Sequence, residues 1–99
     1  MSVDGAWEIT IDTPLGKQFV TLTIATELST LSGTATLGDE TVPFLDPKLA
    51  DSRLTWSQKV TKPFNMTIYF DVQVDGNVMT GTAKAGIFPA TRLNGERKN

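Results

Sequence analysis

Apolar and polar residues alternate along most of this chain, and this period of two constrains its fold more than any other feature. The longest run is Met66–Asp75, in which every second residue is large and apolar. Shorter runs of the same kind begin at Trp7, Val20 and Leu54. A period of two is typical of strands with one buried and one solvated face, and no segment has a convincing helical period. The sequence therefore predicts an all-β protein.

Turn residues interrupt the alternation at regular intervals. Thr13–Gly16 has proline at the second and glycine at the fourth position of a turn, and Asp75–Gly76 is a strong hairpin signal. Eight short strands joined by tight hairpins predict an antiparallel up-and-down (meander) β-barrel, which leaves no open edge and forms a single domain over residues 1–99. The expected strands are Ala6–Asp12, Gln18–Thr26, Leu31–Leu37, Glu40–Leu45, Arg53–Val60, Met66–Val74, Val78–Ala85 and Phe88–Gly95.

The two halves of the sequence resemble each other. Trp7 and Trp56 lie 49 residues apart, and each belongs to a run that leads to a proline turn. The segment Leu31–Ala35 is similar to Met79–Ala83 at an offset of 48 residues. Repeated turn chemistry could produce part of this likeness, but several anchors at nearly one offset favour an internal duplication. We therefore expect a barrel of four plus four strands with approximate two-fold symmetry.

The composition excludes several kinds of catalytic and metal-binding site. The 99 residues include no cysteine and no histidine, which excludes disulfides, thiolate or imidazole metal sites and Ser-His-Asp catalysis. Nine basic and eleven acidic residues give a formal net charge of -2, whereas nucleic-acid binding needs a clustered positive surface. No signal peptide and no apolar run of about 20 residues is visible. We therefore expect a cytoplasmic protein without metal, cofactor, nucleic-acid partner or membrane span.

The opening Gly5-Ala6-Trp7 resembles the Gly-x-Trp on the first strand of calycins, the group of lipocalins, avidins and fatty-acid-binding proteins. The [Ser/Thr]-Gly-Thr strands are similar to those of avidins, and Val74–Phe88 resembles a small bacterial β-module found alone or appended to hydrolases. The calycin resemblance implies a structural pair at one barrel end, in which Trp7 packs under Arg97 or, as second choice, Arg92. With two tryptophans and one tyrosine, the chain does not match an avidin-type biotin site.

If Trp7 points into the barrel, the alternation predicts an almost purely apolar interior. A barrel of eight strands is just wide enough to be filled by side chains or to hold one small ligand. Small residues such as Gly33 and Gly81 favour a space beside the aromatic rings, and a solid core is the alternative. The residues expected to point inward, besides Trp7, are Ile9, Ile11, Val20, Leu22, Ile24, Leu31, Ala35, Leu37, Val42, Phe44, Leu54, Trp56, Ile68, Phe70, Val72, Met79 and Ala83. The expected ligand pocket is formed by Trp56, Phe44, Phe70, Met79, Leu54 and Phe88.

The turns at one end of the predicted barrel are apolar, and those at the other end are polar. Apolar turn tips are unusual, because exposed apolar patches tend to mark interaction sites. Three alternatives stay open: the tips fold over the core, form a subunit or partner interface, or rim a portal for a hydrophobic ligand. The residues that would contribute to a homo-oligomer contact, such as a dimer, are Leu15, Phe64, Ile87 and Phe88.

Acid–base catalysis would have to use carboxylates, lysines or the single tyrosine. The candidates are Tyr69 and Asp71, neighbours on one face of a strand, and Asp46 in the longest connection; an ordinary solvated surface is the alternative for all three. Two hypotheses for function follow. The first is a non-catalytic barrel that binds a hydrophobic small molecule or a protein partner. The second is a cofactor-free enzyme, such as an isomerase, cyclase or lyase, which needs an ionisable group beside an apolar substrate inside the barrel.

Overall fold

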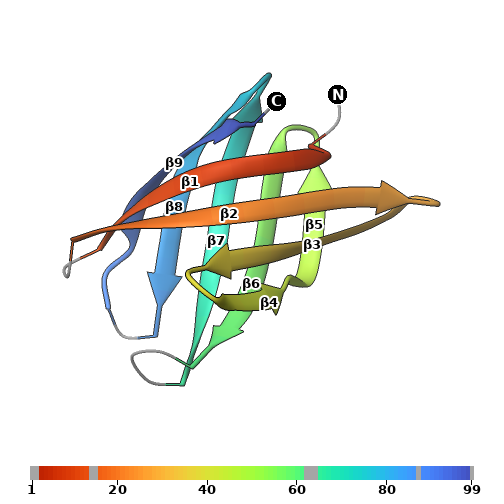
Figure 1. The fold of residues 1–99 in the computed structure, drawn as a ribbon. Coiled ribbons are helices and arrows are strands. Elements are labelled where there is room, and N and C mark those ends of the chain that lie inside the picture. The colour runs from red at the N-terminus through yellow and green to blue at the C-terminus, as the bar shows by residue number, and fades with distance from the viewer. Residues whose placement is uncertain (1–2, 14–15, 62–64, 87, 99) are drawn as a thin grey trace.

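Nine antiparallel strands curl into a nearly closed barrel in the computed structural model, which describes residues 3–13, 16–61, 65–86 and 88–98 (Figure 1). The sheet order is β4-β3-β2-β1-β9-β8-β7-β6-β5, so every neighbouring pair except β1–β9 is also consecutive in the chain. The strands are β1 (Gly5–Thr13), β2 (Gly16–Glu27), β3 (Thr30–Leu37), β4 (Glu40–Pro43), β5 (Leu45–Ala50), β6 (Arg53–Val60), β7 (Met66–Asp75), β8 (Val78–Ala85) and β9 (Thr91–Arg97).

The predicted antiparallel meander is confirmed, but the expectation of eight strands is wrong. The expected strand Glu40–Leu45 ends at Pro43, and the chain continues after Phe44 as β5, where a loop was expected. Pro43 has no N–H to donate to β3, and the Phe44 N–H makes the last bond to this strand, donating to Gly33 O at 2.8 Å. Asp46 has a positive φ of 52°, where the pairing of β5 with β6 shifts in register. The bend lets one continuous segment pair first with β3 and then with β6.

This change of partner is what brings the two sheet ends together. The strands β4 and β5 stand at opposite ends of the sheet order, yet they are joined through the single residue Phe44. The other strands agree with the prediction to within two residues at each end, apart from the last. That strand begins at Thr91 rather than Phe88 and runs on to Arg97, because Pro89 and the turn before it delay the pairing with β8.

The barrel core is one cluster built from the alternating residues of all the long strands. Of the residues expected to point inward, Leu37 is exposed, and Leu31, Val42 and Ile68 are half-buried at the margins. The expectation for Leu37 is wrong because it ends β3, beside the exposed Gly38 turn, beyond the reach of the core. The buried residues are Val3, Trp7, Ile9, Ile11, Val20, Leu22, Ile24, Ala35, Phe44, Leu54, Trp56, Gln58, Phe70, Val72, Val74, Met79, Ala83, Leu93 and Gly95.

The described residues contain no helix of the length and apolar character needed to cross a membrane.

Candidate functional site

Three stacked aromatic rings occupy the region where the sequence predicts a ligand pocket. Trp56 on β6 lies between Phe44 and Phe70, with ring centroids 4.5 Å and 4.7 Å apart and interplanar angles of 13° and 5°. Offset ring pairs at this spacing stabilise a core by about 0.5–1.5 kcal/mol each beyond the area they bury. Leu54 and Met79 are completely buried in the same cluster. The stack fills much of the space that a small ligand would need.

The small residues on the inner strands make room for these side chains. A Cβ placed on Gly33 would lie 2.7 Å from the Phe44 ring, and a Cβ on Gly95 would lie 2.5 Å from Ile9. A Cβ on Gly81 would meet the backbone of β7 at 2.0 Å from Asp71 O. The space directly beside Gly33 and Gly81 is therefore occupied, which favours the solid core over a ligand cavity. Glycine at these positions lets a ring, a methyl group or a neighbouring strand approach closely.

A polar side chain, Gln58, lies inside the barrel, where the sequence predicts almost only apolar ones. It is 6% exposed, and its Oε1 accepts a hydrogen bond of 3.0 Å from Trp56 Nε1. A buried indole N–H needs such a partner, because leaving it unpaired costs about 1–3 kcal/mol. The alternation of β6 could have identified Gln58, since it follows Leu54 and Trp56 at the same spacing. Its role in the structure is to satisfy Trp56.

At the barrel end near the chain termini, Arg97 lies over the Trp7 ring. The Arg97 guanidinium lies 4.4 Å from the centroid of the fully buried Trp7 ring. Its Nη1 donates to Asp4 O and its Nε donates to Asn77 Oδ1 at 2.9 Å. Gly5, with a φ of 123°, leaves room for the arginine, since a Cβ there would lie 3.3 Å from Nη1. The arrangement fastens the N-terminal segment and the β7–β8 turn to the last strand, and the second candidate, Arg92, is exposed elsewhere on β9.

The three candidates for acid–base chemistry all lie on the outside of the barrel. Tyr69 is mostly exposed, and Asp46 is exposed with Lys48 Nζ 3.6 Å from its carboxylate. Asp71 is bound by Arg53 through two hydrogen bonds of 2.5 and 2.9 Å. These hydrogen bonds and the guanidinium charge hold the pKa of Asp71 below its ordinary value. The only polar or charged side chain among the buried described residues is Gln58, which is not ionisable.

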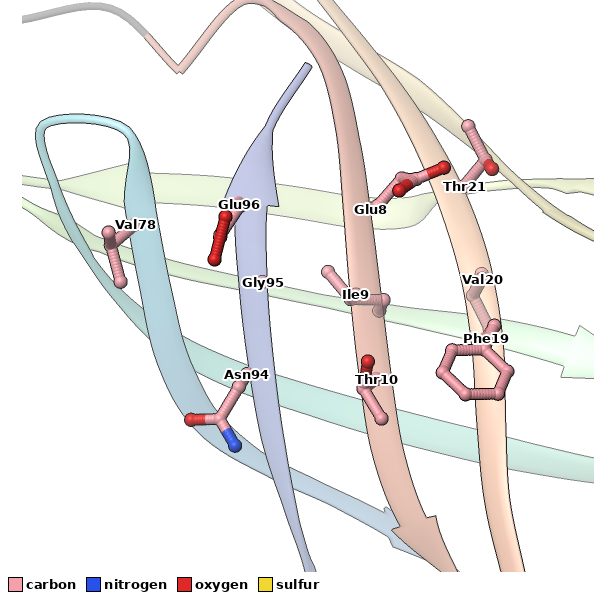
Figure 2. Close-up of a pocket in the computed structure, with 10 residues that line it drawn as sticks. All are labelled: Glu8, Ile9, Thr10, Phe19, Val20, Thr21, Val78, Asn94, Gly95 and Glu96. Carbon is pink, nitrogen blue, oxygen red and sulfur yellow. The ribbon is translucent and has the colours of Figure 1, made fainter.

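A shallow groove of about 670 Å³ runs over the outer face of β1, β2, β8 and β9 (Figure 2). Phe19 on β2 stands at one side and is 69% exposed, and Val78 on β8 lies at the other side. Thr10 and Asn94 lie directly opposite each other between these two side chains. The backbone at Gly95 contributes to the floor. The groove therefore combines exposed apolar walls with hydroxyl and amide groups able to form hydrogen bonds.

Two carboxylates from neighbouring strands, Glu8 and Glu96, line the same groove. Glu8 on β1 is paired in register with Glu96 on β9, on the outer face. Like charges directly opposite on a sheet are destabilising. Glu8 is partly compensated by Lys98, whose Nζ lies 3.3 Å from its Oε1, whereas Glu96 makes no ion pair with another described residue. The groove thus offers negative charge to a cation from outside.

The groove was not predicted from the sequence, although one of its two main features had a signal there. Phe19 precedes the alternating run Val20, Leu22 and Ile24 and so falls on the solvated side, where a large aromatic residue is unusual. The pairing of Glu8 with Glu96 depends on the β1–β9 register, which joins the two ends of the chain. Contacts at this sequence separation have no local signal, so sequence reasoning could find the aromatic wall but not the acidic pair.

A second, apolar hollow of about 580 Å³ lies on the outer face of β7 and β8, at the other end from the termini. It is lined by Met66, Tyr69 and the exposed Phe88, with Lys84 at its side. Phe88 was expected in the interior pocket, and this expectation is wrong: it follows the Gly86 turn and stays outside the core. The other residues expected at an oligomer contact, Leu15, Phe64 and Ile87, lie outside the described part of the chain.

Comparison with known proteins gives no match to this chain among family models, curated proteins or solved structures.

Proposed function

We propose that this protein is a non-catalytic binding module and that it recognises a protein partner through the outer groove of β1, β2, β8 and β9. The observation that carries the proposal is the combination, in one hollow, of the exposed Phe19 ring with the carboxylates of Glu8 and Glu96, which are paired in register on neighbouring strands. Aromatic side chains supply much of the energy of protein interfaces. Facing carboxylates reduce the stability of a sheet, so their presence is better explained by an incoming positive charge than by folding.

The contents of the barrel favour an outer site over an inner one. A hydrophobic small molecule would have to displace rings that are stacked at 4.5 and 4.7 Å around Trp56. Displacing packed core side chains costs several kcal/mol. The enzyme alternative needs an inward ionisable group, and Tyr69, Asp71 and Asp46 are all on the solvent side. We therefore prefer the protein-binding hypothesis to both alternatives.

The groove chemistry indicates what kind of segment it takes. An arginine or lysine of the partner fits between Glu8 and Glu96, where charge-assisted hydrogen bonds to carboxylates are about twice as strong as neutral ones. An apolar side chain next to it fits between Phe19 and Val78. Thr10 and Asn94, in the middle of the groove, can bind the backbone of the segment. The proposed ligand is a short basic segment that also carries an apolar residue.

We further propose that the barrel is calycin-like and arose by duplication of a four-stranded unit. The register of the hairpins supports the duplication. Gly33 on β3 is paired with Ile24, and Gly81 on β8 is paired with Val72. Both members of the second pair therefore lie 48 residues after their counterparts in the first pair. The register of the β1–β2 hairpin likewise corresponds to that of β6–β7, and the register of β3–β4 corresponds to that of β8–β9. In each of these two comparisons, one strand is shifted by 48 residues along the sequence and the other by 49. Under this proposal β5 is the added element that closes the barrel.

Selection from a phage-displayed library of random twelve-residue peptides tests the binding site. We expect enrichment of peptides with arginine or lysine beside an apolar residue, and loss of their binding to Phe19→Ser and Glu96→Gln. The matched controls are Leu37→Ser and Asp39→Asn, which change an exposed leucine and an exposed carboxylate away from the groove. Failure to enrich basic peptides, or equal binding of enriched peptides to Phe19→Ser and wild type, would refute the proposed site.

A further inference from the structure

The tip of the β2–β3 hairpin carries an apolar residue in a backbone conformation that does not suit it. Leu28 and Ser29 have φ values of 50° and 68°, which define a tight hairpin turn with two left-handed residues. Such turns strongly favour asparagine and glycine, because a larger side chain is strained there. Leu28 is also 100% exposed, and Figure 1 shows the tip projecting beyond the rest of the barrel. A strained, fully exposed leucine contributes nothing to folding, which points to a contact with another molecule.

The apolar hollow beside Phe88 lies at the opposite end of the barrel from this tip. The β2–β3 turn is at the end of the termini, whereas the hollow is at the Gly86 turn. Its lining is mainly apolar, from Met66, Tyr69 and Phe88. One molecule therefore has a protruding apolar tip at one end and an apolar recess at the other.

The charges beside these two features are complementary. Glu27 borders the tip, and Lys84 borders the hollow. Neither side chain forms an ion pair within the described residues. Lys84 Nζ donates to Gly86 O at 3.3 Å and to Phe88 O at 2.9 Å, which places the ammonium group next to the Phe88 backbone. The outer groove, in contrast, carries Glu8 and Glu96 and would repel the acidic tip.

The geometry points to head-to-tail self-association, in which Leu28 of one copy enters the hollow beside Phe88 of a second copy and Glu27 pairs with Lys84. A pair of copies joined in this way keeps one free hollow and one free tip, so the contact is heterologous and can propagate into chains. A contact through one hairpin tip is smaller than a standard interface, which is about 1,200–2,000 Å². The association is therefore weak and reversible, and it is separate from the proposed groove.

Sedimentation velocity over roughly 10 µM to 1 mM, a range chosen for a small interface, measures the association. The wild-type weight-average mass rises with concentration. Leu28→Asn with Ser29→Gly weakens association by about tenfold or more, as expected for the loss of one buried leucine, and it raises the Tm because it relieves the strained turn. Leu49→Thr, which changes an exposed leucine on β5, leaves association unchanged. A wild type that stays monomeric up to 1 mM, or equal association of the tip variant and wild type, overturns the inference.

Mixing two inactive variants separates this contact from a symmetric dimer. The tip variant keeps its hollow, and Phe88→Ser keeps its tip, so together they form a dimer that cannot grow further. A symmetric contact between two tips or between two hollows would not be restored by this mixing, and a closed dimer with reciprocal contacts would not grow beyond two copies in the wild type. Glu27→Lys and Lys84→Glu each weaken association alone and restore it when combined in one chain. Absence of a mixed dimer, or failure of the charge-exchanged chain to recover, would contradict the head-to-tail arrangement.

Discussion

Replacing Gly33 by alanine tests whether the space beside the small residues is filled. The new Cβ would lie 2.7 Å from Cε2 and 2.8 Å from Cδ2 of Phe44, whereas carbon atoms in contact are about 3.5–4.0 Å apart. The Phe44 ring cannot retreat freely, because its other face is stacked on Trp56 at 4.5 Å. The Thr23 carbonyl, 3.0 Å from the same Cβ, limits movement on the other side.

The expected cost follows from two opposing effects. Overpacking of a core costs about 1–3 kcal/mol, and the change from glycine to alanine returns about 0.4–1 kcal/mol by restricting the unfolded chain. We therefore expect a net destabilisation of about 1–2 kcal/mol, which lowers the Tm of a domain of this size by about 4–16 °C. Thermal unfolding followed by circular dichroism, together with urea unfolding, measures both quantities.

Two further variants make the test specific to the ring contact. Ser32→Ala, on the exposed face beside Gly33, changes stability by less than about 0.5 kcal/mol. Phe44→Leu removes the ring atoms that meet the new Cβ, so the double variant Gly33→Ala/Phe44→Leu loses less stability than the sum of the single variants. A neutral or stabilising effect of Gly33→Ala, or strict additivity with Phe44→Leu, would refute the reasoning, because it would mean that the site has free space.

Three other substitutions have defined outcomes. Arg97→Ala removes the cation–π contact with Trp7 and the hydrogen bonds to Asp4 O and Asn77, so it lowers the free energy of unfolding by about 2–3 kcal/mol. Urea unfolding measures this loss, with Arg92→Ala as the control. An equal loss in both variants would contradict the prediction. Asp71 has a pKa lowered by Arg53, so its stabilisation is present above the unfolded-state pKa and is lost as the pH falls through the folded-state pKa. Asp71→Asn therefore loses less stability than wild type between pH 6 and pH 3, and parallel urea midpoints would argue against the pairing. Gln58→Leu leaves the indole N–H of Trp56 without its partner and costs about 1–3 kcal/mol, whereas Gln73→Leu on the exposed face is near neutral.

The sequence predicts the architecture of this protein well because the fold depends on local signals. Period-two alternation and turn residues locate eight of the nine strands, and the strand order follows from short hairpins. The exception is β5, whose segment contains Asp46-Pro47-Lys48 and has no alternation. It covers the edge of β6 and itself stands at the end of the sheet order. No local pattern in the segment predicts this pairing.

The candidate site was harder to predict than the fold for a related reason. Alternation states which side of a strand is buried, so it places Tyr69 and Asp71 outside and Trp56 inside. It does not predict whether the barrel interior is filled, because that depends on how the Phe44 ring packs against Gly33 of β3. Nor does it bring Glu8 next to Glu96, a contact set by the register of β1 on β9.

We propose that the protein fills its own barrel and therefore binds on the outside. Methyl-resolved NMR spectra recorded under increasing xenon pressure test it most directly, because xenon enters apolar cavities that water leaves empty. The methyl signals of Leu54, Val72 and Met79, all at the centre of the core, should show only small changes that are linear in pressure. Saturable shifts at these methyl groups would reveal an apolar cavity beside Trp56 and would contradict the claim.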